Sequence, residues 1–350
     1  MGMFTSENNT SCLGIDIGSA GVKIVELKKE GNFARLVSYG FNETKTIENK
    51  NEWKIEKERV AMLINEIRKR AGMKAKIGIA SLPTFSVFSS TLNLSNIAQK
   101  DLGSAIQWEA KKVIPLPLEE MILDWKKIDE TTVGSNKNTK VFLTGAPRSL
   151  VKKYIDIFKE ANIHLSSIET ETFSLIRSLV GGDKSPILIL EIGSSTTDLC
   201  IVEKSMPVLT RSIDIGGLSI TKAISNNLNI SIERAEQFKL DMGVSLNGSS
   251  NDVIPKTIEE SLSPIVNEIK YSLNIFETKN NTQIEKIILS GGSSLILNLP
   301  GYLTKILDRK VIIGNPWARI SYPVELKPVL DEIGPRMAVA AGLALREMEK

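Results

Sequence analysis

Hydrophobic and polar positions follow two different periods along the chain, and together they predict an α/β protein. Apolar residues recur at helical spacing over 52–71 and 100–114, where they form one face of each predicted helix. Short and nearly continuous apolar runs predict buried strands at 22–27, 76–82 and 208–215. Up to residue 82 the predicted order is strand-strand-strand-helix-strand, which is typical of one half of a duplicated α/β protein.

Two stretches half a chain apart share one design: an apolar strand carries an acid, turns at glycine and serine, and returns as a second strand. The first is GIDIGSAGVK at 14–23, and the second is LEIGSSTTD at 190–198. Glycines in such turns let backbone N–H groups approach a phosphate, and the carboxylate can hold a metal ion through water. The candidate phosphate-binding residues are Asp16, Gly18, Ser19, Ala20 and Lys23 in the first stretch and Gly193, Ser194, Ser195 and Thr196 in the second.

For the first stretch alone, the alternative is an ordinary hairpin with an aspartate at its rim. A repeat at half the chain length favours two homologous lobes that face each other across one cleft. A third glycine-rich turn, Gly291-Gly292-Ser293, follows an apolar strand, and Gly216-Gly217 ends the strand at 208–215. Two phosphate hairpins followed by a strand-Gly-Gly-helix turn resemble the actin-like ATPase superfamily. The resemblance implies a two-lobed α/β fold of the actin-like, ribonuclease H-like type.

A helix expected over 231–242 contains the sequence RAEQFK at 234–239. It resembles the Ala-Glu-x-x-Lys element of this superfamily, which implies that Glu236 and Lys239 lie beside the nucleoside. On spacing alone, a glutamate and a lysine three residues apart are typical of a solvated helix face.

The segment 84–130 interrupts the first lobe with a predicted strand, an amphipathic helix and another strand, after which a strand at 140–146 is expected to rejoin the lobe. Within it, WEA at 108–110 and IPLPLEE at 114–120 resemble the family of the type IV pilus assembly protein PilM and, more loosely, the cell-division protein FtsA. The alternative is a plain core helix stopped by prolines. The predicted division is a first lobe (subdomain 1A) of 1–83, 131–183 and 334–350, an FtsA-type inserted subdomain (1C) of 84–130, a second-lobe core (2A) of 184–220 and 284–333, and a helical subdomain (2B) of 221–283.

The resemblance implies a cytoplasmic, ATP-binding adaptor that sits at the inner membrane through a partner. The implied partner is the short cytoplasmic N-terminal tail of a PilN-like membrane protein, with self-association as a further expectation. It also implies Mg²⁺ held through water by Asp16 and Glu191. The superfamily usually has aspartate at the second of these positions, so the longer Glu191 implies an ATPase that is slow at most. FtsA proteins continue into a membrane-binding tail, which this sequence lacks, and this favours the PilM family.

Composition excludes several other functions. A net charge of +3 does not predict nucleic-acid binding, and a single histidine excludes a histidine-rich metal site. No apolar run has the roughly 20 residues that span a bilayer, so no direct membrane insertion is expected. The two cysteines, Cys12 and Cys200, lie on equivalent strands and are expected to be buried thiols. Two other functions stay open: an FtsA-like division adaptor, and a small-molecule kinase with a catalytic base in the cleft.

Overall fold

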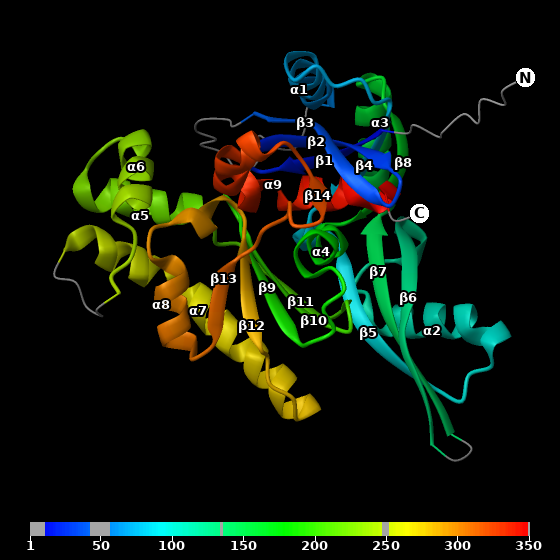
Figure 1. Ribbon diagram of the computed structural model, residues 1–350. Coiled ribbons are helices and arrows are strands. Elements are labelled where there is room, and N and C mark those ends of the chain that lie inside the picture. Colours follow the sequence, from blue (N-terminus) through cyan, green and yellow to red (C-terminus); the bar gives the residue numbers. More distant parts are fainter. Residues whose placement is uncertain (1–10, 43–56, 134–135, 247–251, 349–350) are drawn as a thin grey trace, which may run out of the picture.

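The computed structural model describes residues 11–42, 57–133, 136–246 and 252–348, and it contains two lobes built on one plan (Figure 1). The strand order is β14-β3-β2-β1-β4-β8 in the first sheet and β11-β10-β9-β12-β13 in the second. In each sheet an antiparallel three-stranded meander is followed by two parallel strands, which confirms the predicted duplication. The first sheet contains β1 (Ser11–Gly18), β2 (Gly21–Glu30), β3 (Phe33–Phe41), β4 (Ile77–Leu82), β8 (His164–Thr170) and β14 (Ile320–Ser321). The second contains β9 (Ile187–Ile192), β10 (Thr197–Glu203), β11 (Met206–Ile213), β12 (Lys286–Ser290) and β13 (Lys310–Ile313).

Alternation along the strands divides their side chains between separate cores. Ile15 of β1 packs with α1 (Lys57–Arg70) and α3 (Arg148–Glu160), which cover one face of the first sheet. In the second lobe, Leu188 and Leu190 of β9 pack with α5 (Gly217–Leu228), α6 (Ile232–Met242), α7 (Val253–Asn280) and α8 (Leu299–Leu307). The part of α1 predicted over 52–56 lies outside the described residues.

A separate apolar core joins the lobes. It combines Cys12 of β1, Ile189 of β9 and Cys200 of β10 with Leu343 of α9 (Lys327–Met348). Figure 1 shows α9 between the two sheets. Both cysteines are buried and free, as predicted, and burial raises the pKa of the Cys200 thiol.

The predicted division of the chain at residue 333 falls inside α9 and is therefore wrong at this point. The helix begins at Lys327 and continues through Pro335. Its first turns are held by apolar burial, because Leu330 and Ile333 pack with Leu27 of β2. This burial outweighs the one helical hydrogen bond that a proline cannot donate. Among the described residues, no helix is both long and apolar enough to cross a membrane.

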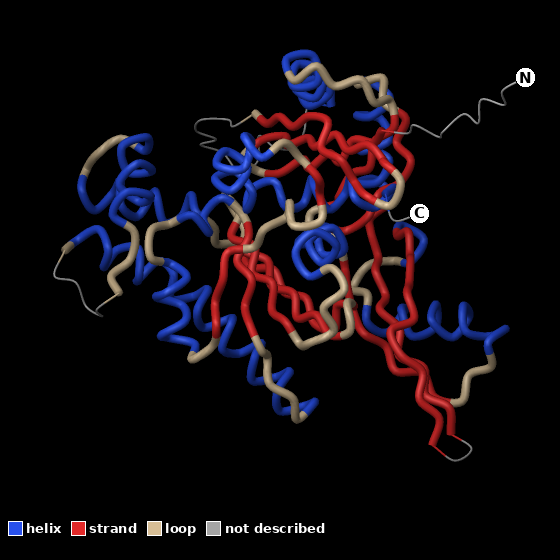
Figure 2. The backbone as a smooth tube through the Cα atoms, viewed as in Figure 1, coloured by secondary structure: helices blue, strands red, loops and turns tan. Residues whose placement is uncertain are grey.

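The inserted segment forms a three-stranded sheet in the order β5-β7-β6, with α2 (Leu102–Val113) against it. Its strands are β5 (Phe88–Ser95), β6 (Met121–Val133) and β7 (Asn136–Pro147). The prediction that the strand at 140–146 rejoins the first lobe is wrong, because β7 pairs with β5 and β6, and Val141 and Leu143 are buried in the core of the insert. We therefore define the insert as residues 84–147. Figure 2 shows β6 and β7 as a long ribbon that projects from the body of the protein.

Candidate nucleotide and metal site

The first glycine-rich hairpin, formed by β1 and β2, pairs an acid with a base. Asp16 and Lys23 lie directly opposite each other in the antiparallel register, and Lys23 Nζ is 2.8 Å from Asp16 Oδ2. Burial acts to lower the pKa of Lys23, but the charge and hydrogen bond of Asp16 outweigh it, so the pKa is raised and the ammonium stays charged. The other oxygen, Asp16 Oδ1, is buried and accepts no hydrogen bond from the described residues.

The second hairpin, formed by β9 and β10, has the same register but places two acids opposite each other. Glu191 pairs with Asp198 where the first hairpin has Asp16 and Lys23. Like charges that face each other across antiparallel strands destabilise a sheet. This pair of acids is therefore expected to lower the stability of the folded protein. Such destabilising features are concentrated at functional sites.

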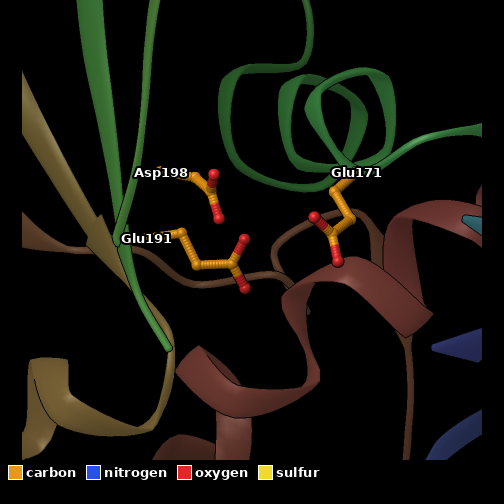
Figure 3. A group of neighbouring side chains, drawn as sticks. All are labelled: Glu171, Glu191 and Asp198. Atoms are coloured by element: carbon orange, nitrogen blue, oxygen red, sulfur yellow. The ribbon is translucent and has the colours of Figure 1, made fainter. Parts of the chain in front are cut away.

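A third carboxylate, Glu171, completes an acidic cluster with Glu191 and Asp198. It begins the short helix α4 (Glu171–Leu175), which follows β8 of the first lobe. Figure 3 shows Glu171 and Glu191 directed toward each other from the two lobes, with Asp198 above Glu191. One carboxylate oxygen from each of the three residues lies within 4.8 Å of the others.

Burial raises the pKa values of all three acids, and repulsion from neighbouring acids adds to this at Glu171 and Glu191. The pKa of Glu191 is raised to about 8 by burial, by Asp198 and by Asp16, against an opposing effect of Lys23. The pKa of Asp198 is raised to about 6 by burial, although hydroxyl donors partly offset this. Glu171 is affected in the same direction by burial and by the neighbouring acids. At neutral pH the cluster therefore retains protons that a bound cation would replace.

The residues fit a hard divalent cation such as Mg²⁺. Such ions take oxygen ligands, and the cluster offers carboxylate oxygens only. Asp198 Oδ1, like Asp16 Oδ1, is buried without a hydrogen-bond partner among the described residues. Buried acceptors without partners are rare in folded proteins, and coordination of an ion is one role that accounts for them. Glu171, Glu191 and Asp198, with Asp16 nearby, are thus the residues that could hold the ion.

The predicted glycine turns of the second lobe meet at one point. The N–H of Gly217 donates to Gly193 O, so the start of α5 lies against the second hairpin turn. A Cβ on Gly217 would lie 2.1 Å from Ser293 Oγ, and a Cβ on Gly291 would lie 2.4 Å from Ile192 O. The backbone approach at Gly291, which also has a φ of +82°, is one that only glycine permits.

Gly292 differs from the other glycines of this junction. A Cβ at this position would have no atom within 4 Å among the described residues. The space above Gly292 is therefore available to a ligand.

Lys239 is buried in the same region and held there by polar groups. Its Nζ donates to Glu236 Oε2 at 2.7 Å, to Thr221 Oγ1 at 3.0 Å and to Gly217 O at 3.2 Å. The Lys239 side chain is 3% exposed and that of Glu236 is 47% exposed. Burial lowers the pKa of Lys239, and Glu236 opposes this effect. The lysine is therefore no part of a solvated helix face, and Glu236 reaches from it toward solvent.

Sequence reasoning placed most of these groups but missed two of the three acids in the cluster. Asp198 stands in the predicted motif and lies directly opposite Glu191 in the hairpin. The expected antiparallel pairing could therefore have identified it. Glu171 had no comparable signal, because it reaches the site only through the tertiary position of α4. The structure also places Lys23 on Asp16, so its predicted contact with phosphate competes with an existing ion pair.

The duplicated sheets, the paired hairpins and the acids between the lobes define a protein of the actin-like class. Solved structures agree on the fold. MreB5 of Spiroplasma citri bound to AMPPNP superposes with a TM-score of 0.54 at 15% identity, covering 97% of this chain and 96% of that one. EutJ from Carboxydothermus hydrogenoformans gives a TM-score of 0.56 at 13% identity, covering 96% of this chain and 89% of that one.

Within this class, the family model described as "Type IV pilus assembly protein PilM" matches residues 14–348, and the chain belongs to that family. A structure described as the PilM-PilN type IV pilus biogenesis complex superposes with a TM-score of 0.84 at 25% identity, covering 97% of this chain and 99% of that one. The cell-division protein FtsA of Neisseria meningitidis is 22% identical over 283 residues, or 71% of this chain and 66% of FtsA. FtsA of Agrobacterium fabrum is 25% identical over 178 residues, or 45% of this chain and 39% of FtsA. The chain thus spans less than two thirds of the length of these curated relatives.

Proposed function

We propose that this protein is an ATP-binding adaptor of a type IV pilus assembly platform, which binds Mg²⁺ with the nucleotide and holds the N-terminal tail of a PilN-like membrane protein. The observation that carries the nucleotide half is the acidic cluster of Glu171, Glu191 and Asp198 between two matching glycine-rich hairpins. A solved protein of the same fold was crystallised with the ATP analogue AMPPNP, which supports a nucleotide as the ligand.

In this proposal the residues divide into three roles. The acids hold the cation, the glycine turns bring backbone N–H groups to the phosphates, and Glu236 and Lys239 border the nucleoside. A bound magnesium ion neutralises phosphate charge and orients the transferable phosphoryl group. The proposed phosphate and nucleoside residues are Gly18, Ser19, Ala20, Lys23, Gly193, Ser194, Ser195, Thr196, Gly216, Gly217, Glu236, Lys239, Gly291, Gly292 and Ser293.

Exposed apolar side chains on the insert support the partner half. Trp108 of α2 is 64% exposed, Leu116 is 48% exposed, and Ile122 and Trp125 of β6 are 39% and 36% exposed. β6 is also an edge strand of its sheet, which leaves backbone groups available to an extended peptide. Peptides are commonly captured by strand edges and apolar pockets together. The similar PilM-PilN complex makes a PilN-like tail the favoured peptide.

The experiment for the nucleotide half is calorimetric titration of the full chain with ATP, with and without MgCl₂. Binding that strengthens with Mg²⁺ is expected. The absence of any saturable binding under both conditions would refute this half.

The experiment for the partner half is a pull-down from membranes followed by titration with a synthetic peptide of the captured tail. Trp125→Ala should weaken peptide binding and leave ATP binding unchanged. Phe33→Ala is the matched control, because Phe33 is an aromatic residue 73% exposed on β3, outside the insert. Equal loss in both variants, or capture of lipid alone, would contradict the assignment and favour an FtsA-like adaptor.

Phosphoryl transfer is a second candidate, and Glu171 is the observation that favours it. A small-molecule kinase requires a carboxylate base near the nucleotide, and Glu171 faces Glu191 from the other lobe. Incubation with ATP and a panel of sugars and small acids separates the two functions. A phosphorylated product would favour the kinase.

A further inference from the structure

Glu171 touches the insert as well as the other acids of the candidate site. Its Oε2 accepts two hydrogen bonds from Thr84, one from the backbone N–H at 2.8 Å and one from Oγ1 at 3.1 Å. Thr84 is the first residue of the insert and starts a turn of 3₁₀ helix directly after β4 and Pro83. These two hydrogen bonds fix the position of the carboxylate, so a residue of the insert orients an acid of the candidate metal site.

The opposite side of α4 is packed against the strands of the insert. The ring of Phe173 meets Phe142 of β7 edge-on, with centroids 5.8 Å apart. Lys126 Nζ lies 4.2 Å from the centroid of the same ring, and Lys126 and Phe142 are register partners across β6 and β7. The short helix α4 therefore contacts the insert through both Glu171 and Phe173, and Glu171 is also one of the three acids of the cluster.

α4 has little room to move on its own. A Cβ added to Gly342 of α9 would lie 1.9 Å from Ser174 O, so the two helices are in close backbone contact. The insert also reaches the second lobe, where Thr91 Oγ1 of β5 donates to Val208 O of β11 at 3.3 Å. Because α4 is held against α9, a shift of the insert relative to the lobes would instead change the contacts of Thr84 with Glu171 and of Phe142 with Phe173.

We propose that Thr84 is a positioning residue for Glu171, so that occupation of the nucleotide site and the conformation of the insert are energetically coupled. This inference rests on the proposed nucleotide binding and adds the residues that link it to the insert. Coupling of this kind is reciprocal: a ligand that orders Glu171 also orders the insert, and a partner that fixes the insert strengthens nucleotide binding by the same factor.

The test combines calorimetry with hydrogen exchange on the full chain, using MgCl₂ and ATP as probes. In the wild-type protein, MgATP should slow exchange of the β6 and β7 amides. Thr84→Val removes the hydroxyl donor and keeps the branched shape. It should weaken MgATP binding about tenfold, the lower end of what one hydrogen bond to a charged group contributes, and abolish the slowing. Thr84→Ser restores the hydroxyl and should behave as wild type. Thr144→Val is the matched control, because Thr144 Oγ1 of β7 donates to Asp124 O inside the insert.

A second variant keeps the test decisive if Thr84→Val does not fold. Phe173→Leu leaves the Thr84–Glu171 hydrogen bonds in place but removes the ring that contacts Phe142. It should retain MgATP affinity and reduce the slowing of exchange. Wild-type affinity and exchange in Thr84→Val, or failure of Thr84→Ser to restore them, would overturn the inference. If the wild-type protein binds MgATP but exchange in the insert does not slow, only the inferred coupling is overturned. If it does not bind MgATP at all, the proposed nucleotide-binding function is overturned as well.

Discussion

Replacing Glu191 with glutamine should stabilise the protein at alkaline pH when no cation is present. The pKa of Glu191 is raised to about 8 in the folded protein from an ordinary value of 4.5, so the folded state binds more protons than the unfolded state between these values. The free energy of unfolding must therefore fall as pH rises from about 4.5 to about 8, and level off above that. Glutamine has nearly the same shape and cannot ionise, so the variant lacks this fall.

The size of the effect follows from the shift. One pKa unit corresponds to about 1.4 kcal/mol, which sets a ceiling near 5 kcal/mol for a pKa of about 8. Some solvent reaches Glu191 and the neighbouring acids share its proton, so we expect Glu191→Gln to gain about 2 kcal/mol at pH 8.5.

Urea unfolding between pH 5 and pH 9, with EDTA and then with MgCl₂, measures this directly. The wild-type and variant proteins should be equally stable at pH 5 and diverge as pH rises, and MgCl₂ should stabilise the wild-type protein more than the variant. Glu285→Gln, at an exposed position, is the control for loss of one carboxylate. A constant difference between Glu191→Gln and wild type across the pH range would refute the assignment of a strained, protonated cluster.

Three further predictions concern the nucleotide. Gly292→Val should abolish ATP binding in a folded protein, since the space above Gly292 is otherwise open; unchanged affinity by calorimetry would leave this turn with a structural role only. Asp16→Ala should weaken MgATP binding because it removes an acid near the metal and releases Lys23 from its ion pair, and equal affinity would exclude Asp16 from the site. Phosphate-release assays should give a turnover well below the ~1 per second of slow enzymes, and Glu191→Asp should raise it with little change in affinity, because one methylene fewer repositions the carboxylate; a wild-type turnover of many per second without a partner would contradict this.

The parts of the fold that the sequence could predict are those set by local patterns. Both hairpins combine strand alternation with a glycine turn, so their register and the acid at each rim follow from a few neighbouring residues. Long-range pairing was less accessible. The strand at 140–146 is apolar enough for either sheet, and only its pairing with β5 and β6 assigns it to the insert.

The same distinction applies to the candidate site. Lys239 could be singled out only by resemblance, because its burial depends on the packing of α5 and α6. Glu171 escaped notice because its partner Thr84 is remote in sequence and no local spacing relates the two. A site assembled from the ends of several elements leaves no single motif that contains it.

The position of α9 has a consequence for how the protein is made. Gly14 of β1 lies so close to this helix that a Cβ would approach Ala340 O to 2.0 Å, and Leu27 of β2 is buried against it. During synthesis, one face of the first sheet must therefore wait for residues 327–348 before it can be covered. Contacts this distant in sequence form late and slowly. One face of the second sheet also packs on this helix, through Ile189 and Cys200. Until α9 is made, each lobe therefore exposes an apolar sheet face, so the yield of folded protein in the cell should depend on chaperones.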